Sequence, residues 1–168
     1  MNGNTTSLNK RNTAFVAASI AIIILLFLAG ALAQKEKMEW LYDFKLKQQA
    51  EQLITNKDYR QAKVNLELLL AKDRHARNPS VLQDYALCVN VLGDSAKALE
   101  YYDRAREVSP LLVTNSLFLA KYAETLYKLG KLQEARKYLE ISMIINTNKE
   151  LAPLLIDLKA TLDKQLGS

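Results

Sequence analysis

The side chains of this sequence that are capable of chemistry are few and widely spaced. The densest basic stretch runs from Lys72 to Arg77 and contains the single histidine, His75. Phosphate binding is one interpretation of this stretch, and a solvated loop between helices is the favoured one. A lone histidine with so few partners cannot assemble a metal site. The single cysteine, Cys88, lies in the apolar stretch 85–89, so we expect a small buried side chain.

No motif of catalysis or nucleotide binding is present. The sequence lacks a Gly-rich phosphate loop, a G-x-S-x-G turn and an H-E-x-x-H pair. Beyond Ala33 there are 21 Lys and Arg against 18 Asp and Glu, a net charge of +3, without the clustering that nucleic-acid binding requires. One cysteine forms no intramolecular disulfide and so indicates no compartment. We therefore expect neither an enzyme nor a nucleic-acid-binding protein, and no cofactor or metal.

Residues 14–33 form an apolar segment without a charged side chain, in which eleven of twenty residues are Leu, Ile, Phe or Val. At about 1.5 Å per residue, a helix of this length matches the ~30 Å hydrocarbon layer of a bilayer. Each strongly apolar residue near its centre favours insertion by roughly 0.3–0.6 kcal/mol. A buried helix of a soluble domain would keep a polar stripe, which this segment lacks. The sequence predicts a transmembrane helix at 14–33, in contact with the lipid bilayer.

This segment is either a retained signal anchor or a cleaved signal peptide. Lys10 and Arg11 form a basic leader, and the small residues 31–33 before Gln34 are typical of a cleavage site. The apolar run exceeds the ~7–15 residues of a signal-peptide core, so a retained anchor is favoured. Lysines on both sides leave the orientation open by charge alone, although long domains translocate largely regardless of charge. We expect a single-pass membrane protein with its C-terminal part exported, and the composition and short leader suit a bacterial cell envelope.

Three stretches of the remaining chain align with one another, at 46–70, 82–108 and 119–145. Each contains an apolar helical pattern, a short turn, and an alanine that begins a second helical pattern. These alanines, Ala62, Ala98 and Ala135, are 36 and 37 residues apart. No Gly or Pro occurs between Gly30 and Pro79, so one helix can continue from the apolar segment into the first repeat. This period is close to that of stacked helix–turn–helix units of about 34 residues.

The repeated pattern resembles the tetratricopeptide repeat (TPR) over residues 44–149. Small residues stand where the two helices of that family's unit cross, here Ala50, Ala86 and Ala123 on the first helices. Gly93 and Gly130 match the turn glycine, Tyr102 and Leu139 the bulky position of the second helix, and Pro110 the closing proline. The first repeat departs most, because Asn56 and Lys57 stand where Gly is expected and no proline closes it.

The resemblance implies that the first helices line a concave groove that holds a peptide or a partner helix. The family's groove positions correspond to Lys47, Glu51, Gln83, Leu87, Asn90, Ala120, Glu124, Tyr127 and Lys128. For each of them, an ordinary solvated or packing position is the alternative. In members that grip acidic chaperone tails, Lys and Asn stand at set places. Lys47 fits that pattern, but Glu51 stands where Asn is expected and Leu117 where Lys is expected, which argues against a carboxylate clamp.

We therefore expect an all-α chain, with an N-terminal transmembrane helix followed by a TPR-like α-solenoid of three helix pairs and a C-terminal capping helix. Stacked units need such a cap because each buries its apolar face against the next. Leu151, Leu155, Leu158 and Leu162 form the apolar stripe of the cap. The expected boundaries are a short tail at 1–13, the membrane helix at 14–33, a juxtamembrane helical linker at 34–43, repeats at 44–77, 79–112 and 116–149, and the cap at 150–168.

This organisation favours a membrane-anchored scaffold or adaptor that binds other proteins or peptides through the groove. Two alternatives remain. The first is an envelope chaperone-like or translocon-associated helper that holds unfolded segments, which requires exposed apolar surface in the groove. The second is a receptor for targeting peptides, which requires the reverse orientation in the membrane.

Overall fold

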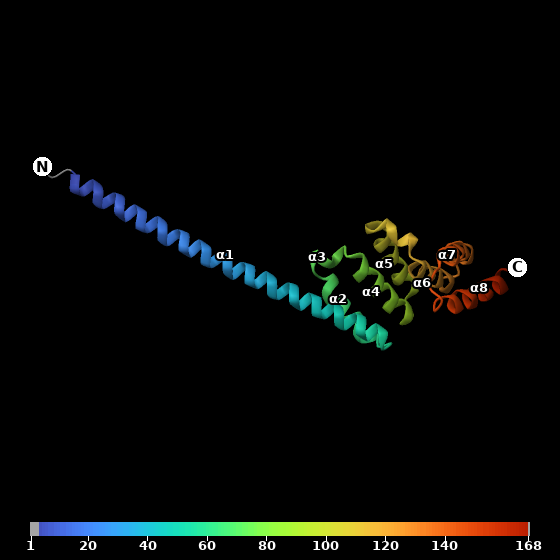
Figure 1. Cartoon of the computed structure of the whole chain (residues 1–168). Helices are drawn as coiled ribbons and strands as arrows, with labels where there is room; N and C mark the ends of the chain where they lie inside the picture. The colour runs from blue at the N-terminus through green and yellow to red at the C-terminus, as the bar shows by residue number, and fades with distance from the viewer. Residues whose placement is uncertain (1–3, 168) are drawn as a thin grey trace. The chain divides into compact units, whose positions relative to one another are not determined.

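The computed structural model describes residues 4–167, which form helices joined by short turns and contain no strand (Figure 1). The helices are α1 (Asn4–Thr55), α2 (Tyr59–Leu70), α3 (Asp73–Ala76), α4 (Pro79–Val91), α5 (Ser95–Val108), α6 (Ser116–Lys128), α7 (Leu132–Ile145) and α8 (Ala152–Leu166), with a 3-10 helix, η1, at Pro110–Thr114. The chain divides into two compact units, an N-terminal unit (Met1–Phe44) and a repeat unit (Lys45–Ser168).

The N-terminal unit is a stretch of α1 with an apolar surface. Its described apolar side chains between Phe15 and Leu32 are exposed, up to 82% at Phe27. The hydroxyl of Ser19 donates to the carbonyl oxygen of Phe15 at 2.9 Å, so this polar group is satisfied within the helix. Within residues 4–167, α1 is the one helix long and apolar enough to cross a membrane, judged by its length and composition.

The repeat unit is built from helices that pack on their neighbours in sequence. α4 packs on α5 and α6 on α7, while α5 contacts α6, α2 contacts α4, and α8 closes on α7. Their apolar faces share one core cluster, which also takes in Leu46 and Ala50 from the last turns of α1. Because each pair covers the open face of the previous one, burial is continuous along the stack.

The alanines that define the repeat belong to the core of the repeat unit. Ala50, Ala86 and Ala123 on the first helices and Ala62, Ala98 and Ala135 on the second have no exposed surface. The bulky positions Tyr102 and Leu139 are also buried. The helical register inferred from the sequence is therefore the one that the structure has.

The turn within each repeat uses one backbone arrangement three times. Lys57, Gly93 and Gly130 adopt positive φ angles of 62°, 99° and 74°. The next residue's N–H then donates to the carbonyl five residues earlier, from Asp58 to Leu53 at 2.8 Å and from Asp94 to Val89 at 2.9 Å. This is the Schellman arrangement, in which a left-handed residue closes a helix.

The structure differs from the sequence expectations at the connections. Residues 4–13, expected as a tail, are helical and belong to α1, whereas residues 1–3 and 168 lie outside the described residues. The basic stretch 72–77, expected as a loop, contains the single turn α3. Asn78 follows it and caps α4 by accepting from the N–H groups of Ser80 and Val81. The cap helix α8 begins at Ala152, with Pro153 in its first turn.

We predict that Lys57→Gly stabilises the repeat unit by about 0.5–1 kcal/mol. Lys57 holds a left-handed conformation that costs a residue with a Cβ about 1–2 kcal/mol, and the greater freedom of Gly in the unfolded chain offsets part of the gain. Scanning calorimetry of the full-length protein in detergent measures the effect. Lys57→Ala, which removes the charge but keeps the Cβ, should give no gain, and a gain equal to that of Lys57→Gly would contradict the backbone explanation.

Candidate functional site

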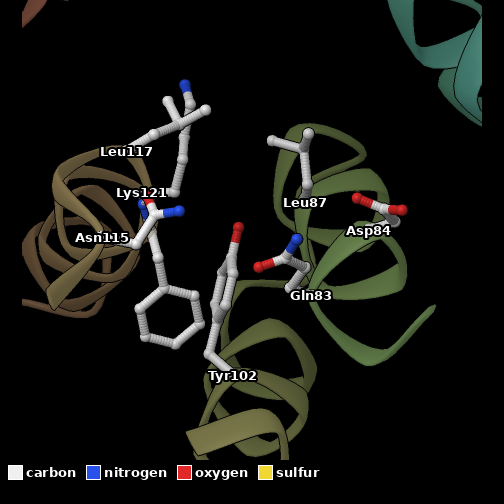
Figure 2. A pocket seen from close by; sticks show the side chains of 8 residues that line it. Gln83, Asp84, Leu87, Tyr102, Asn115, Leu117 and Lys121 are labelled. Carbon is white, nitrogen blue, oxygen red and sulfur yellow. Dashed lines mark hydrogen bonds between the residues drawn. The ribbon is translucent and has the colours of Figure 1, made fainter. Parts of the chain in front are cut away.

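A cavity of about 110 Å³ opens between α4, α5 and α6 in the repeat unit. α4 contributes Gln83, Asp84 and Leu87, α5 contributes Tyr102, and the start of α6 contributes Asn115, Leu117, Phe118 and Lys121. Figure 2 shows the side chains of α4 on one side and those of α6 on the other, with the Tyr102 ring standing between them. The exposed surface of the walls is mainly apolar, although five of the eight lining residues carry a polar group.

The hydroxyl of Tyr102 points into this cavity (Figure 2). Its ring is 2% exposed and meets Phe118 edge-on, with 5.5 Å between the ring centroids. The hydroxyl has no hydrogen-bond partner among the described residues. Burial, followed by the nearby charges of Glu124 and Asp84, raises the pKa of Tyr102 well above its usual value, so the phenol stays neutral. A buried neutral hydroxyl of this kind can donate one hydrogen bond and accept others.

Asp84 lies at the α4 side of the cavity. Burial is the main cause that raises the pKa of its carboxyl group to about 6, and the negative charge of Glu51 adds to it, while Lys47 opposes the shift. No ion pair or hydrogen bond of its side chain occurs among the described residues. The structure therefore holds an uncompensated carboxyl group beside an apolar cavity, an arrangement that favours a positively charged neighbour.

The lysines of the same face are already paired. Lys47 lies 3.4 Å from Glu51, and Lys121 and Lys128 both contact Glu124 at 3.1 Å. Burial disfavours the charged form of Glu124, but the two lysines outweigh it and lower the pKa of this carboxyl group. These cations are thus partly neutralised within the protein and are not an open basic surface.

The predicted groove residues fall into four groups. Gln83 and Leu87 line the cavity between α4 and α6, whereas Glu124, Tyr127 and Lys128 face α8, beside Leu154, Asp157, Leu158 and Thr161. Lys47 and Glu51 form an ion pair on the last turns of α1. Asn90 and Ala120 are 1% exposed, so they are packing positions in this structure.

Asn90 illustrates the packing alternative. Its side-chain oxygen accepts from the hydroxyl of Ser95 at 2.9 Å, and its backbone carbonyl accepts from the ammonium of Lys128 at 3.5 Å. Asn90 therefore fixes the turn between α4 and α5 and ties α4 to α6. Cys88 is fully buried as expected, and burial raises the pKa of its thiol to about 12, so thiolate chemistry is suppressed.

The sequence pattern does not identify the polar residues that distinguish the cavity. The repeat register gives Tyr102 a packing role only, and it gives no role to Asp84, next to Gln83 on α4. The repeat pattern identifies which residues are large or small, but it does not reveal which way a hydroxyl group points. The acidic residue at 84 is a usable signal, because burial disfavours an unpaired carboxylate even where the side chain stays partly exposed.

Comparisons with solved structures agree on the fold. The chain is similar to the TPR domain of Sgt2 from Aspergillus fumigatus, with 18% identity and a TM-score of 0.59 over 75% of this chain and 82% of that one. It is also similar to the first TPR domain of human RPAP3, with 19% identity and a TM-score of 0.59 over 75% of this chain and 96% of that one. Yeast Tom70 matches at 26% identity with a TM-score of 0.54, over 74% of this chain but 24% of that one.

No protein-family model and no curated protein matches the sequence. The structural likeness therefore identifies the fold. This chain has an all-α TPR fold, with one candidate membrane-spanning helix at its N-terminus.

We predict that Asp84→Asn raises the stability at about pH 7 by on the order of 1–2 kcal/mol. The folded-state pKa of Asp84, about 6, lies above the ordinary value of 3.8 for this carboxyl group, so the folded protein binds this proton more tightly than the unfolded chain. The resulting destabilisation is absent below the unfolded pKa, grows between the two values and is complete above the folded one. Calorimetry at about pH 7 and about pH 4 should therefore show a gain that disappears on acidification.

Gln83→Ala is the matched control for this experiment. Gln83 lines the same cavity but does not titrate, so the effect of its removal should be equal at both pH values. A gain for Asp84→Asn that is the same at both pH values would show that its carboxyl group is not destabilised by burial.

Proposed function

We propose that this protein is a membrane-anchored adaptor whose TPR groove binds a segment of another protein. The observation that carries the proposal is the cavity between α4 and α6, with apolar walls and a buried hydroxyl group that lacks a partner. Concave, mainly apolar sites with a few convergent polar groups are the usual form of a binding site. We propose Gln83, Leu87, Glu124, Tyr127 and Lys128 as groove contacts, with Lys47 and Glu51 at its α1 end.

Two similar structures support binding of peptides as a general mode for this fold. The first TPR domain of Spaghetti (RPAP3) is described as bound to the HSP90 peptide SRMEEVD, and the second TPR domain of human RPAP3 as in complex with the HSP70 peptide SGPTIEEVD. We carry over the binding of an extended segment to this chain. The acidic character of those peptides is not carried over, since Glu51, Asp84 and Leu117 stand in this groove.

We further propose that α1 holds the protein in a membrane and that residues 14–33 are the span. The support is the exposed apolar surface of this helix, which water would disfavour at roughly 25 cal/mol per Å². The proposed layout has the repeats at 44–77, 79–112 and 116–149 on the exported side of a bacterial envelope. Two alternative functions would use the same groove. One is a helper that holds unfolded client segments, and the other, in the reverse membrane orientation, is a receptor for targeting peptides.

The anchor predicts that the full-length protein stays in the membrane pellet after alkaline carbonate extraction. Leu25→Arg combined with Leu26→Arg places two charges in the middle of the span, each costing about 2.5–3.5 kcal/mol in insertion experiments, and should release the protein. Phe44→Arg, outside the span, should leave it in the pellet. A soluble wild-type product that begins at Gln34 would show that the segment is a cleaved leader.

The groove predicts which variants lose partners. Cross-linking and co-purification from detergent-solubilised membranes should recover the same proteins with the wild type and with Arg74→Ala plus Arg77→Ala, which changes the exposed basic stretch around α3. Leu87→Asp plus Leu117→Asp should lose them, because two carboxyl groups are introduced into the apolar wall. Loss with the arginine variant and retention with the leucine variant would contradict the groove model.

A further inference from the structure

The charges around the cavity indicate what kind of segment it accepts, provided that the groove binds peptides as proposed above. The last turns of α1, together with α4 and α6, carry three lysines, Lys47, Lys121 and Lys128, and three acids, Glu51, Asp84 and Glu124. The ion pairs involve every one of these residues except Asp84. The charges therefore balance overall, and the carboxyl group of Asp84 is the acid left unneutralised beside the cavity.

An acidic ligand fits this distribution poorly. Its carboxylate would have to approach Asp84 and Glu51, and like charges brought together at an interface destabilise it strongly. The nearest lysine of the cavity wall, Lys121, already shares Glu124 with Lys128. A cationic group, in contrast, would compensate the carboxylate that burial and Glu51 disfavour.

The cavity itself fits an aliphatic side chain. Leu87, Leu117 and Phe118 supply apolar surface, and Leu117 is 54% exposed, so a ligand can cover it. An engineered apolar cavity of about 150 Å³ holds benzene. The smaller volume here, about 110 Å³, suits a Leu, Ile or Val side chain.

The hydroxyl of Tyr102 supplies the remaining contact. It is buried, neutral and unpartnered among the described residues, and it points to where a bound segment would pass (Figure 2). A peptide carbonyl oxygen is the acceptor that any sequence offers at this place. Because a buried donor left unpaired destabilises the free protein, a ligand that pairs it gains affinity without sequence preference.

We infer that the cavity between α4 and α6 binds a peptide segment with an aliphatic residue flanked by Lys or Arg. The aliphatic side chain enters between Leu87 and Leu117, the flanking cation lies against Asp84, and Tyr102 donates to the peptide backbone. This groove therefore prefers a positively charged ligand, whereas a groove that binds acidic tails prefers a negatively charged one.

An array of short Leu-centred peptides, with flanking positions that are all Lys, all Ser or all Glu, tests this inference on the full-length protein in detergent. The wild type should bind the Lys set about tenfold more tightly than the Ser set, a ratio typical of one charged contact, and the Glu set least. Asp84→Lys should reverse the ranking, and Asp84→Asn should reduce the Lys preference towards one. Asp73→Lys, the same change of charge on α3, should leave the ranking as in the wild type.

Tyr102→Phe separates the hydrogen bond from the charge. It should weaken all three peptide sets by a similar factor while keeping their order, because the hydroxyl contacts only the backbone of the ligand. Equal or tighter binding of the Glu set by the wild type would overturn the inference and leave the groove intact. Binding of all sets that is unchanged by Leu87→Asp would overturn the proposed groove function as well.

Discussion

The repeat unit depends on small side chains at the positions where its helices pack together. All six alanines of the repeated positions are fully buried and belong to the shared core. A longer side chain there would separate the helices or force strained rotamers, at about 1–3 kcal/mol for each site. The remaining geometry follows from this constraint. When each pair is held at a fixed spacing, the first helices align side by side, and residues of α4 and α6 that are distant in sequence face one cavity.

Hydrogen bonds between successive repeats fix how the packed helices are aligned along one another. Tyr85 of α4 donates to Glu67 of α2 at 2.9 Å, and Tyr122 of α6 donates to Asp103 of α5 at 2.7 Å. Both bonds join the first helix of one repeat to the second helix of the previous one. The bond at Tyr122 lies beside Arg106, which contacts Asp103 and also donates to Tyr138. An apolar contact alone would tolerate sliding of one helix along the other, whereas a hydrogen bond at each junction fixes the register of the stack.

The sequence predicted the features that repeat and missed those that occur once. Alanine spacing, turn glycines and apolar periodicity predict the helix pairs. Lys57, which stands where the family has Gly, adopts the same left-handed conformation as Gly93 and Gly130. The connections α3 and η1 were not predicted, because a single helical turn leaves no periodic pattern in the sequence. Among the groove positions, Asn90 and Ala120 are buried, since a family register gives the face of a helix but not its exposure after packing.

Two residues that line the cavity lower the stability of the folded protein relative to simple replacements. Phe in place of Tyr102 would keep the ring contacts with Phe118 without burying an unpaired hydroxyl, and Asn in place of Asp84 would avoid a destabilised carboxyl group. The hydroxyl group of Tyr122, in contrast, is paired with Asp103. A hydroxyl group without a hydrogen-bond partner and a destabilised carboxyl group thus line the same cavity, from α5 and α4. Such coincident departures are characteristic of surfaces that a ligand completes. The missing partners are an acceptor for a hydroxyl group and a cation for a carboxylate, and the basic peptide segment inferred above offers both.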